Sequence, residues 1–283
     1  MKFLAVYLFL AVGFLKGDEW VVLSAVGDLP SRPEVVEGFG GEAFLEGEDR
    51  DAFSVTVDDR GMSLLFSPRR GKGVYRADLK TGEGVVRVFG LGTEKLEGSN
   101  EPGLQDIFRV LGVDLDAGGR GLHLNTREAV MGDSVAVSEF VPVEGEAVRV
   151  TGVARYSPKG ETPFGFVLPD GKLVEIGVLD AETETLPDAH QRILPPVSGG
   201  QRTVTVKEVP ERFGLYLEAH RYTSLTIPGA SKGATIEHTA RVFPVKKLMG
   251  RERRNAYLIC FEEASNGDYQ DAIFLLEGVK AVE

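Results

Sequence analysis

The chain has 283 residues and a formal net charge of −11. Nucleic acids favour a basic protein face, so this charge argues against binding to a phosphate backbone. An acidic surface instead suits divalent cations and solubility. The length allows one large β domain or two smaller ones with a buried core. Cys260 is the only cysteine, which excludes an intrachain disulfide, and its apolar neighbours indicate a buried strand residue.

The N-terminus has the pattern of a secretory signal peptide. An early lysine is followed by an apolar run from Phe3 to Leu15, which is shorter than the roughly 20 residues that cross a bilayer. Asp18 and Glu19 then turn the chain polar, which favours a signal peptide over a buried first strand. We expect residues 1–17 to be removed, leaving no transmembrane segment in a secreted, periplasmic or cell-surface bacterial protein. An intact N-terminus in the mature protein would favour a cytoplasmic β protein.

Residues 18–92 are expected to form a small N-terminal β region. Short alternating apolar runs recur between breaks rich in glycine, proline and charge, the rhythm of β-sandwiches and barrels. Expected strands cover 20–25, 52–57, 62–66, 73–78 and 84–89. The turn at Asp58–Gly61 joins two of them as a hairpin. The pattern predicts a meander of four or five strands.

Residues 93–135 are expected to be a linker with one short helix. The stretch 91–103 is polar and rich in helix breakers. Leu104, Ile107, Phe108 and Leu111 then recur at the helical spacing i, i+3, i+4 and i+7. Gly112 supplies a C-terminal stop. A stripe of this kind predicts a face that packs against the core.

Residues 136–283 are expected to form the main domain. Its expected strands are 136–141, 147–156, 164–168, 173–179, 202–209, 213–218, 236–245, 256–261 and 272–276. Turn residues separate most of these alternating runs. We therefore predict an all-β protein: a jelly-roll-like antiparallel β-sandwich with a smaller N-terminal β region and one short helix.

A short acidic loop between the last two expected strands is the strongest functional signal. Its oxygen-bearing side chains are Glu262, Glu263, Asn266, Asp268 and Asp271. Ca²⁺ takes six to eight oxygen ligands, and backbone carbonyls or water could complete the set. No cysteine or histidine lies within the loop, which disfavours transition metals. These five residues are therefore predicted to bind calcium, and a solvated acidic hairpin is the alternative.

The same segment resembles a known family. Phe261-Glu262-Glu263 followed by the run at 266–271 is similar to the end of a β-sandwich module of secreted bacterial proteins, a family known only as a domain of unknown function. Asn266 stands where that family more often has aspartate. The segments 213–217 and 237–244 resemble upstream strands of the module. The resemblance covers less than half of the chain, and it implies a calcium-binding, non-catalytic surface module.

Two further acidic sets are weaker candidates for a metal site. Residues 46–51 and the pair Asp114 and Asp116 are expected to be solvated loops, because runs of charge usually lie on the surface. The four histidines are isolated and lack a zinc-binding spacing. Serine-nucleophile, nucleotide and dinucleotide motifs are also missing from the sequence. We therefore expect no catalysis.

The predicted function is an exported binding or structural module with a cell-surface or adhesive role. Its expected partners are calcium and, beyond that, a glycan or a cell-surface protein. The alternative is a carbohydrate-active enzyme or a carbohydrate-binding accessory protein. In that case Trp20, Tyr216, His220 and Tyr222 could form a sugar-stacking surface.

Overall fold

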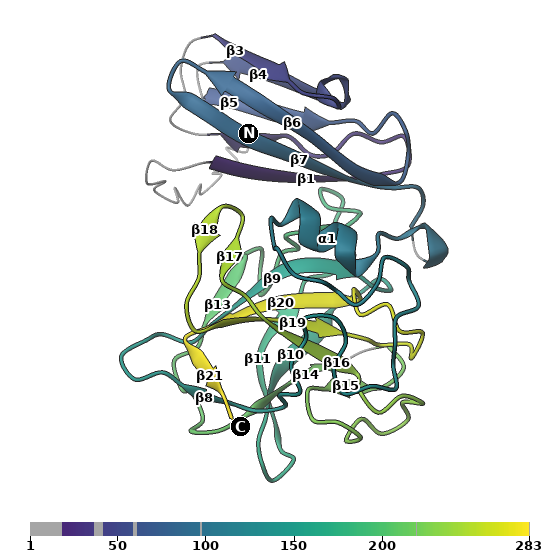
Figure 1. Ribbon diagram of the computed structural model, residues 1–283, viewed down its shortest axis with the longest axis vertical. Coiled ribbons are helices and arrows are strands. Elements are labelled where there is room, and N and C mark those ends of the chain that lie inside the picture. The colour runs from purple at the N-terminus through teal and green to yellow at the C-terminus, as the bar shows by residue number, and fades with distance from the viewer. Residues whose placement is uncertain (1–18, 37–41, 59–60, 97, 219, 283) are drawn as a thin grey trace, which may run out of the picture.

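The computed structural model describes residues 19–36, 42–58, 61–96, 98–218 and 220–282. The expected signal peptide at 1–17 lies outside these described residues. Regular structure in the described part is mostly β, with several sheets and one short α-helix (Figure 1), which confirms the predicted all-β sandwich class. None of the helices in these ranges has the length and apolar character needed to cross a membrane.

The N-terminal strands form two small sheets. One has the order β1-β7-β6-β3 and the other β2-β5-β4. Their bounds are β1 (Glu19–Val26), β2 (Glu34–Val36), β3 (Ala43–Glu46), β4 (Phe53–Asp58), β5 (Gly61–Phe66), β6 (Gly73–Thr81) and β7 (Gly84–Thr93), with a 3₁₀ turn at Arg50–Ala52 between β3 and β4. A single hydrophobic cluster joins the two sheets, with Leu64, Phe66 and Leu79 fully buried in it.

The expected meander is wrong in its strand order. β1 pairs in parallel with β7, from Glu19 opposite Val86 to Val26 opposite Thr93. Parallel neighbours need a long connection between them, and here the other five strands provide it. Local alternation of apolar residues marks where strands lie but does not encode which distant strands pair.

The predicted helix is confirmed as α1 (Leu104–Val110), which follows a 3₁₀ turn at Gly98–Asn100. Its C-terminus forms a Schellman motif, in which the Gly112 N–H donates to Arg109 O at 3.1 Å and the Val113 N–H to Phe108 O at 2.9 Å. Gly112 has φ +64°, a conformation that favours glycine. The expected stop signal therefore ends the helix.

The C-terminal strands form two larger sheets and two short pairs. The sheets have the orders β12-β9-β20-β19-β16, with β13 also on β9, and β11-β10-β14-β15, while β17 pairs with β18 and β21 with β8. The bounds are β8 (Phe140–Pro142), β9 (Arg149–Tyr156), β10 (Thr162–Val167), β11 (Leu173–Leu179), β12 (Gln191–Ile193), β13 (Thr203–Thr205), β14 (Gly214–Glu218), β15 (Thr223–Leu225), β16 (Ala240–Pro244), β17 (Lys247–Leu248), β18 (Arg251–Glu252), β19 (Ala256–Phe261), β20 (Ala272–Glu277) and β21 (Val279–Ala281).

The larger C-terminal sheet is buried on both faces. Ile259 and Phe274 point to the second sheet and join one hydrophobic cluster. Cys260 and Ile273 point the other way and join a cluster that contains α1 and residues of β1 and β7. Successive strand residues alternate between faces, so two covered faces produce the continuous apolar runs of β19 and β20. Cys260 is a buried strand residue, as predicted.

The helix α1 connects the N-terminal sandwich to this sheet (Figure 1). Phe108 packs edge-to-face on Phe243 of β16 with ring centroids 5.1 Å apart. On the N-terminal side, Trp20 of β1 stacks on Phe89 at 4.4 Å and its Nε1 donates to Val110 O at 2.8 Å. The two halves of the chain therefore share one hydrophobic cluster around the helix.

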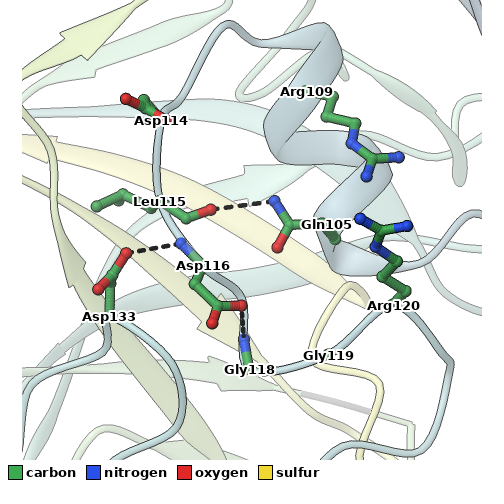
Figure 2. Close-up of a pocket in the computed structure, with 9 residues that line it drawn as sticks. All are labelled: Gln105, Arg109, Asp114, Leu115, Asp116, Gly118, Gly119, Arg120 and Asp133. Carbon is green, nitrogen blue, oxygen red and sulfur yellow. Dashed lines mark hydrogen bonds between the residues drawn. The ribbon is translucent and has the colours of Figure 1, made fainter.

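The segment after α1 folds back along the helix (Figure 2). The Gln105 side-chain amide donates to Leu115 O at 3.0 Å and accepts from the Ala117 N–H at 2.9 Å. Asp116 accepts from the Gly118 N–H at 2.8 Å. Asp133 accepts from the Asp116 N–H at 2.7 Å. The carboxylates of Asp116 and Asp133 are thus used to hold this irregular backbone in place.

We expect Phe108→Ala to lower the free energy of unfolding by about 3–5 kcal/mol, because it removes a fully buried ring from the cluster that joins the helix to the sheet. Denaturant unfolding measures the change. Phe44→Ala is the control, since Phe44 is 57% exposed and its loss should change stability by no more than about 0.5 kcal/mol. Equal effects of the two substitutions would contradict the proposed packing.

Candidate metal centre

The acidic loop at residues 262–271 connects β19 and β20. These strands are antiparallel neighbours, and the pair Phe261 and Ala272 closes the base of the loop. The middle of the loop turns through Gly267, which has φ +88°. A Cβ atom there would lie 2.8 Å from the Thr126 side chain and 3.0 Å from Leu124 O. Only glycine fits this close approach to the segment 124–126.

Three carboxylates of the loop converge. Glu262, Asp268 and Asp271 each offer an oxygen within 4.8 Å of the others, and all three side chains are buried. Carboxylate oxygens are the ligands that hard divalent cations prefer. The cluster could therefore hold a metal ion.

Glu262 organises the backbone around the cluster. Its Oε1 accepts from the Ala264 N–H at 2.7 Å, and its Oε2 accepts from the N–H groups of Gly267 at 2.7 Å and Asp268 at 2.9 Å. Asp271 accepts from the Glu263 N–H at 2.6 Å. These bonds curl the loop inward, so its acidic side chains face one another instead of the solvent.

One oxygen of the cluster lacks a partner. Asp268 Oδ2 accepts from the Asn266 side-chain amide at 2.8 Å. Asp268 Oδ1 is buried and has no hydrogen-bond partner among the described residues. A buried acceptor without a partner costs about 1–3 kcal/mol, and more when it is charged. A cation held by the cluster could give this oxygen a partner.

The other two predicted ligands take different positions. Glu263 is buried and accepts from the His220 N–H at 3.5 Å, and it attracts the Arg155 guanidinium electrostatically. Asn266 is exposed and presents its amide nitrogen to Asp268. The structure thus gathers three of the five predicted side chains, with Glu263 and Asn266 at the border of the cluster.

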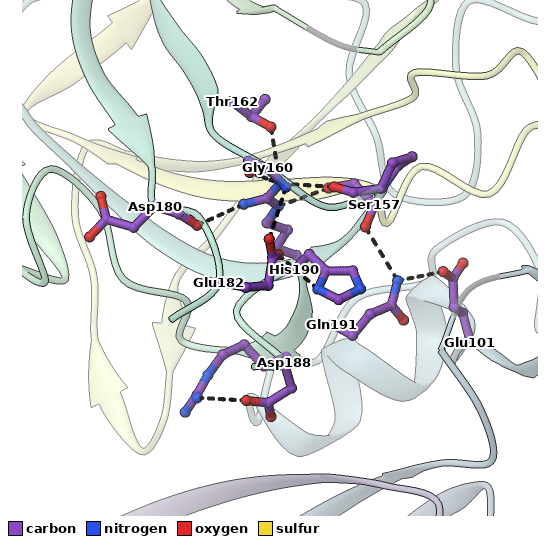
Figure 3. Close-up of polar contacts among 12 residues, drawn as sticks. Glu101, Ser157, Gly160, Thr162, Asp180, Glu182, Asp188, His190 and Gln191 are labelled. Carbon is purple, nitrogen blue, oxygen red and sulfur yellow. Dashed lines mark hydrogen bonds and ion pairs between the residues drawn. The ribbon is translucent and has the colours of Figure 1, made fainter. Parts of the chain in front are cut away.

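Another buried carboxylate, Glu101, lies beside the loop and was not expected from the sequence. It precedes α1, yet it receives a hydrogen bond from Gln191 at 2.7 Å (Figure 3). A second hydrogen bond comes from Gln270 at 2.9 Å. Desolvation is the main cause that raises the pKa values of Glu263 and Asp268, and the charge of Glu101 adds a small part. No local pattern indicates this contact, because Glu101 and Gln270 lie far apart in the chain.

Arg155 and Arg241 direct their hydrogen bonds to oxygens outside the acidic loop, and those of Arg155 include the hydroxyls of Ser157 and Thr162. Arg155 donates to Pro158 O and Asp180 O at 3.0 Å each and to Gly160 O at 2.6 Å. Arg241 lies over the Tyr269 ring at 5.0 Å and donates to Asn125 O, Glu128 O and Ala129 O at 2.7–2.9 Å. Their charges act on the acidic loop from a distance, without the hydrogen bonds that would satisfy its carboxylates.

Burial changes the protonation of the loop. Desolvation, followed by repulsion from neighbouring carboxylates, raises the pKa of Asp268 to about 8. Desolvation raises the pKa of Glu263 to about 7, and it raises the pKa of Asp271 well above its usual range. Without a cation, part of the cluster therefore keeps its protons near neutral pH.

Asp114 and Asp116 lie together beside α1, whereas the set at 46–51 is used in local contacts. Asp49, from the 46–51 set, forms an ion pair with Arg70 and accepts from the Arg76 N–H at 3.0 Å. Trp20 is packed against Phe89 inside the molecule, whereas the Tyr222 hydroxyl contacts Ser265 at 3.0 Å. Trp20 and Tyr222 are thus each engaged by other residues of the protein.

Comparisons with protein-family models, curated proteins and solved structures give no match to this chain.

The raised pKa values predict that the metal-free protein loses stability as the pH rises. Glu263 and Asp268 ionise at pH about 7 and about 8 in the folded protein, but at about pH 4 in the unfolded chain. Between these values the folded protein binds more protons, so the free energy of unfolding falls with increasing pH. Urea unfolding in the presence of chelator, from about pH 5 to about pH 8, measures this slope.

Matched variants identify the groups responsible. Asp268→Asn removes one buried titrating carboxyl, so the stability of this variant should fall less steeply with pH. Glu184→Gln is the control, because Glu184 is exposed and lies outside the cluster. The same slope in the parent protein and in Asp268→Asn would show that Asp268 does not titrate in this range.

Proposed function

We propose that this chain is an exported, non-catalytic binding or structural module whose C-terminal acidic loop binds Ca²⁺. The unpartnered, buried Asp268 Oδ1 beside Glu262 and Asp271 carries this proposal. A cation there would give the oxygen a partner and would neutralise carboxylates that otherwise repel one another in a poorly solvated space.

Calcium suits the donor set better than other common metals. The cluster offers carboxylate oxygens, and the loop contains neither histidine nor cysteine. Magnesium demands near-ideal octahedral geometry and keeps several waters, whereas calcium accepts irregular shells of six to eight oxygens. The backbone and any bound water would have to supply the ligands beyond the three side chains.

The proposed role of the ion is to stabilise the fold. The loop joins the two strands whose side chains enter both C-terminal hydrophobic clusters. An ion bound only by the folded protein raises the free energy of unfolding. The thiol of Cys260 is fully buried and its pKa is raised well above its usual value by desolvation, which argues against a reactive nucleophile there.

Export and a cell-surface role rest on the first residues and on the resemblance of the C-terminal segment to modules of secreted bacterial proteins. A glycan or a cell-surface protein is the proposed partner. The acidic net charge disfavours nucleic acid.

Calcium should raise the melting temperature of the protein relative to the same protein in chelator. At free calcium about 100 times the Kd the gain is about 2.7 kcal/mol, which corresponds to a rise in Tm of roughly 5–10 °C. Thermal unfolding followed by circular dichroism measures it, with magnesium in a parallel sample. A response to magnesium as large as that to calcium would contradict the assigned identity of the ion.

The double variant Asp268→Asn, Asp271→Asn should lose the response to calcium. It should still fold, because the change removes repulsion between buried carboxylates and keeps their volume, so its Tm in chelator should equal or exceed that of the parent protein. Glu184→Gln should retain the full calcium response. An unchanged calcium shift in the double variant would show that the ion binds elsewhere.

Expression in a bacterial host of the chain from Met1 should yield an exported mature protein that lacks residues 1–17, because the apolar run after Lys2 fits a signal peptide. Intact-mass spectrometry of the periplasmic and extracellular fractions measures the mature mass. A full-length protein confined to the cytoplasm would contradict export without bearing on calcium binding.

A further inference from the structure

An open hollow of about 700 Å³ lies beside α1. Its walls come from the helix, from the loop at 114–120 and from Asp133 (Figure 2). Sites for small ligands typically span about 300–1,000 Å³. The hollow is therefore large enough for a monosaccharide unit or for part of a longer chain.

The backbone that lines the hollow is fixed before any ligand arrives. Gln105 holds both Leu115 O and the Ala117 N–H through its side-chain amide. Asp133 accepts from the Asp116 N–H, and the Asp133 N–H donates to Asp116 O at 2.8 Å. A wall fixed by hydrogen bonds loses little conformational entropy when a ligand binds.

One wall of the hollow presents guanidinium N–H groups that are free to donate hydrogen bonds to a ligand. Arg120 forms no hydrogen bond or ion pair with any residue in the described ranges. Arg109 uses one nitrogen, in its contact with Asp106 at 3.0 Å. Figure 2 shows these two guanidinium groups on the same side of the hollow. A guanidinium binds a carboxylate or phosphate through two parallel N–H bonds.

The opposite wall presents acceptors. The Asp114 carboxylate is exposed and is engaged by none of the described side chains or backbone groups. Asp116 and Asp133 lie on the same side as Asp114 (Figure 2). Ionised carboxylates only accept hydrogen bonds, so the ligand group that faces this wall must donate.

The lining also restricts the ligand to polar chemistry. Among the described residues of the hollow, Leu115 alone has an apolar side chain, and none is aromatic. Stacking on an aromatic ring, which dominates recognition of nucleic acid bases, is therefore not available from this lining. A ligand with hydroxyl groups fits, because each hydroxyl can donate to a carboxylate and accept from a guanidinium.

We propose that this hollow binds an acidic sugar, with the sugar carboxylate on Arg109 and Arg120 and its hydroxyl groups donating to Asp114 and Asp116. This assignment goes beyond the calcium proposal and does not depend on it, because none of its contacts involves the acidic loop. The hollow then gives the module a specific partner surface: the uronate units of a glycan.

Titration with D-glucuronate, followed by ligand-observed NMR at constant ionic strength, tests the proposal on the full chain in the presence of calcium. D-glucose, inorganic phosphate and glycine are titrated in parallel. Glucuronate should bind more tightly than the other three, because only it combines a carboxylate with several hydroxyl donors. Arg120→Gln replaces charge-assisted hydrogen bonds with neutral ones, so it should weaken glucuronate binding at least about tenfold.

Asp114→Asn should also weaken glucuronate binding, whereas Arg69→Gln, at an exposed arginine of the N-terminal sandwich, should leave it unchanged. A cooperative thermal unfolding transition with a Tm close to that of the parent protein serves as the check that each variant is folded. Absence of glucuronate binding would overturn the proposal, and so would equal binding in Arg120→Gln. Equally tight binding of phosphate would assign a simple anion site, and equally tight binding of glycine an amino-acid site.

Discussion

The position of β19 and β20 in the middle of a sheet covered on both faces is the constraint on which the rest of the structure depends. One face packs on the second C-terminal sheet and the other on α1 with the edge of the N-terminal sandwich. The loop that joins these two strands therefore emerges among neighbouring segments instead of into solvent. Leu124 donates to Gly267 O at 2.7 Å, and Gln270 contacts Glu101, so chain segments from outside the hairpin close around it.

This enclosure disfavours the ionised form of the acidic side chains in the loop, because it removes them from water. Glu262, Asp268 and Asp271 are removed from water, and the hydrogen bonds of Arg155 and Arg241 go to oxygens outside the acidic loop. Burial favours the protonated forms of Asp268 and Asp271, whereas a bound cation would favour their ionised forms. The raised pKa values correspond to proton uptake by these carboxyl groups, and the proposed calcium ion would take the place of those protons. The two compete, since a bound cation requires deprotonated ligands.

The two proposed sites lie along one stretch of chain. The segment that begins at Asp114 lines the hollow beside α1 and then reaches Leu124, which is bonded to the acidic loop. The helix next to it carries Arg109 on its exposed face and Phe108 on its buried face. In the proposed function, the ion stabilises the sheet on which this segment packs, and the hollow provides the surface that meets a ligand.

Local features of the chain were predictable because neighbouring residues decide them. The helical spacing from Leu104 to Leu111 and the glycine at 112 predict α1 with its correct stop, and the strand at 173–179 is observed as expected. The acidic loop was also identified, because its residues are close in sequence. The pairing of strands was not predictable from local features. The parallel contact of β1 with β7 depends on a long crossover, and the periodicity of apolar residues does not encode its path.

The sequence by itself determined the all-β class, the helix and the acidic composition of one loop. Only the tertiary structure decided that Glu262, Asp268 and Asp271 converge while Glu263 accepts from the His220 N–H. Adjacent side chains on an extended chain point in different directions, so adjacent glutamates can meet different surroundings. The tertiary fold also brought Glu101 to Gln270, because burial places side chains by packing and not by their distance along the chain.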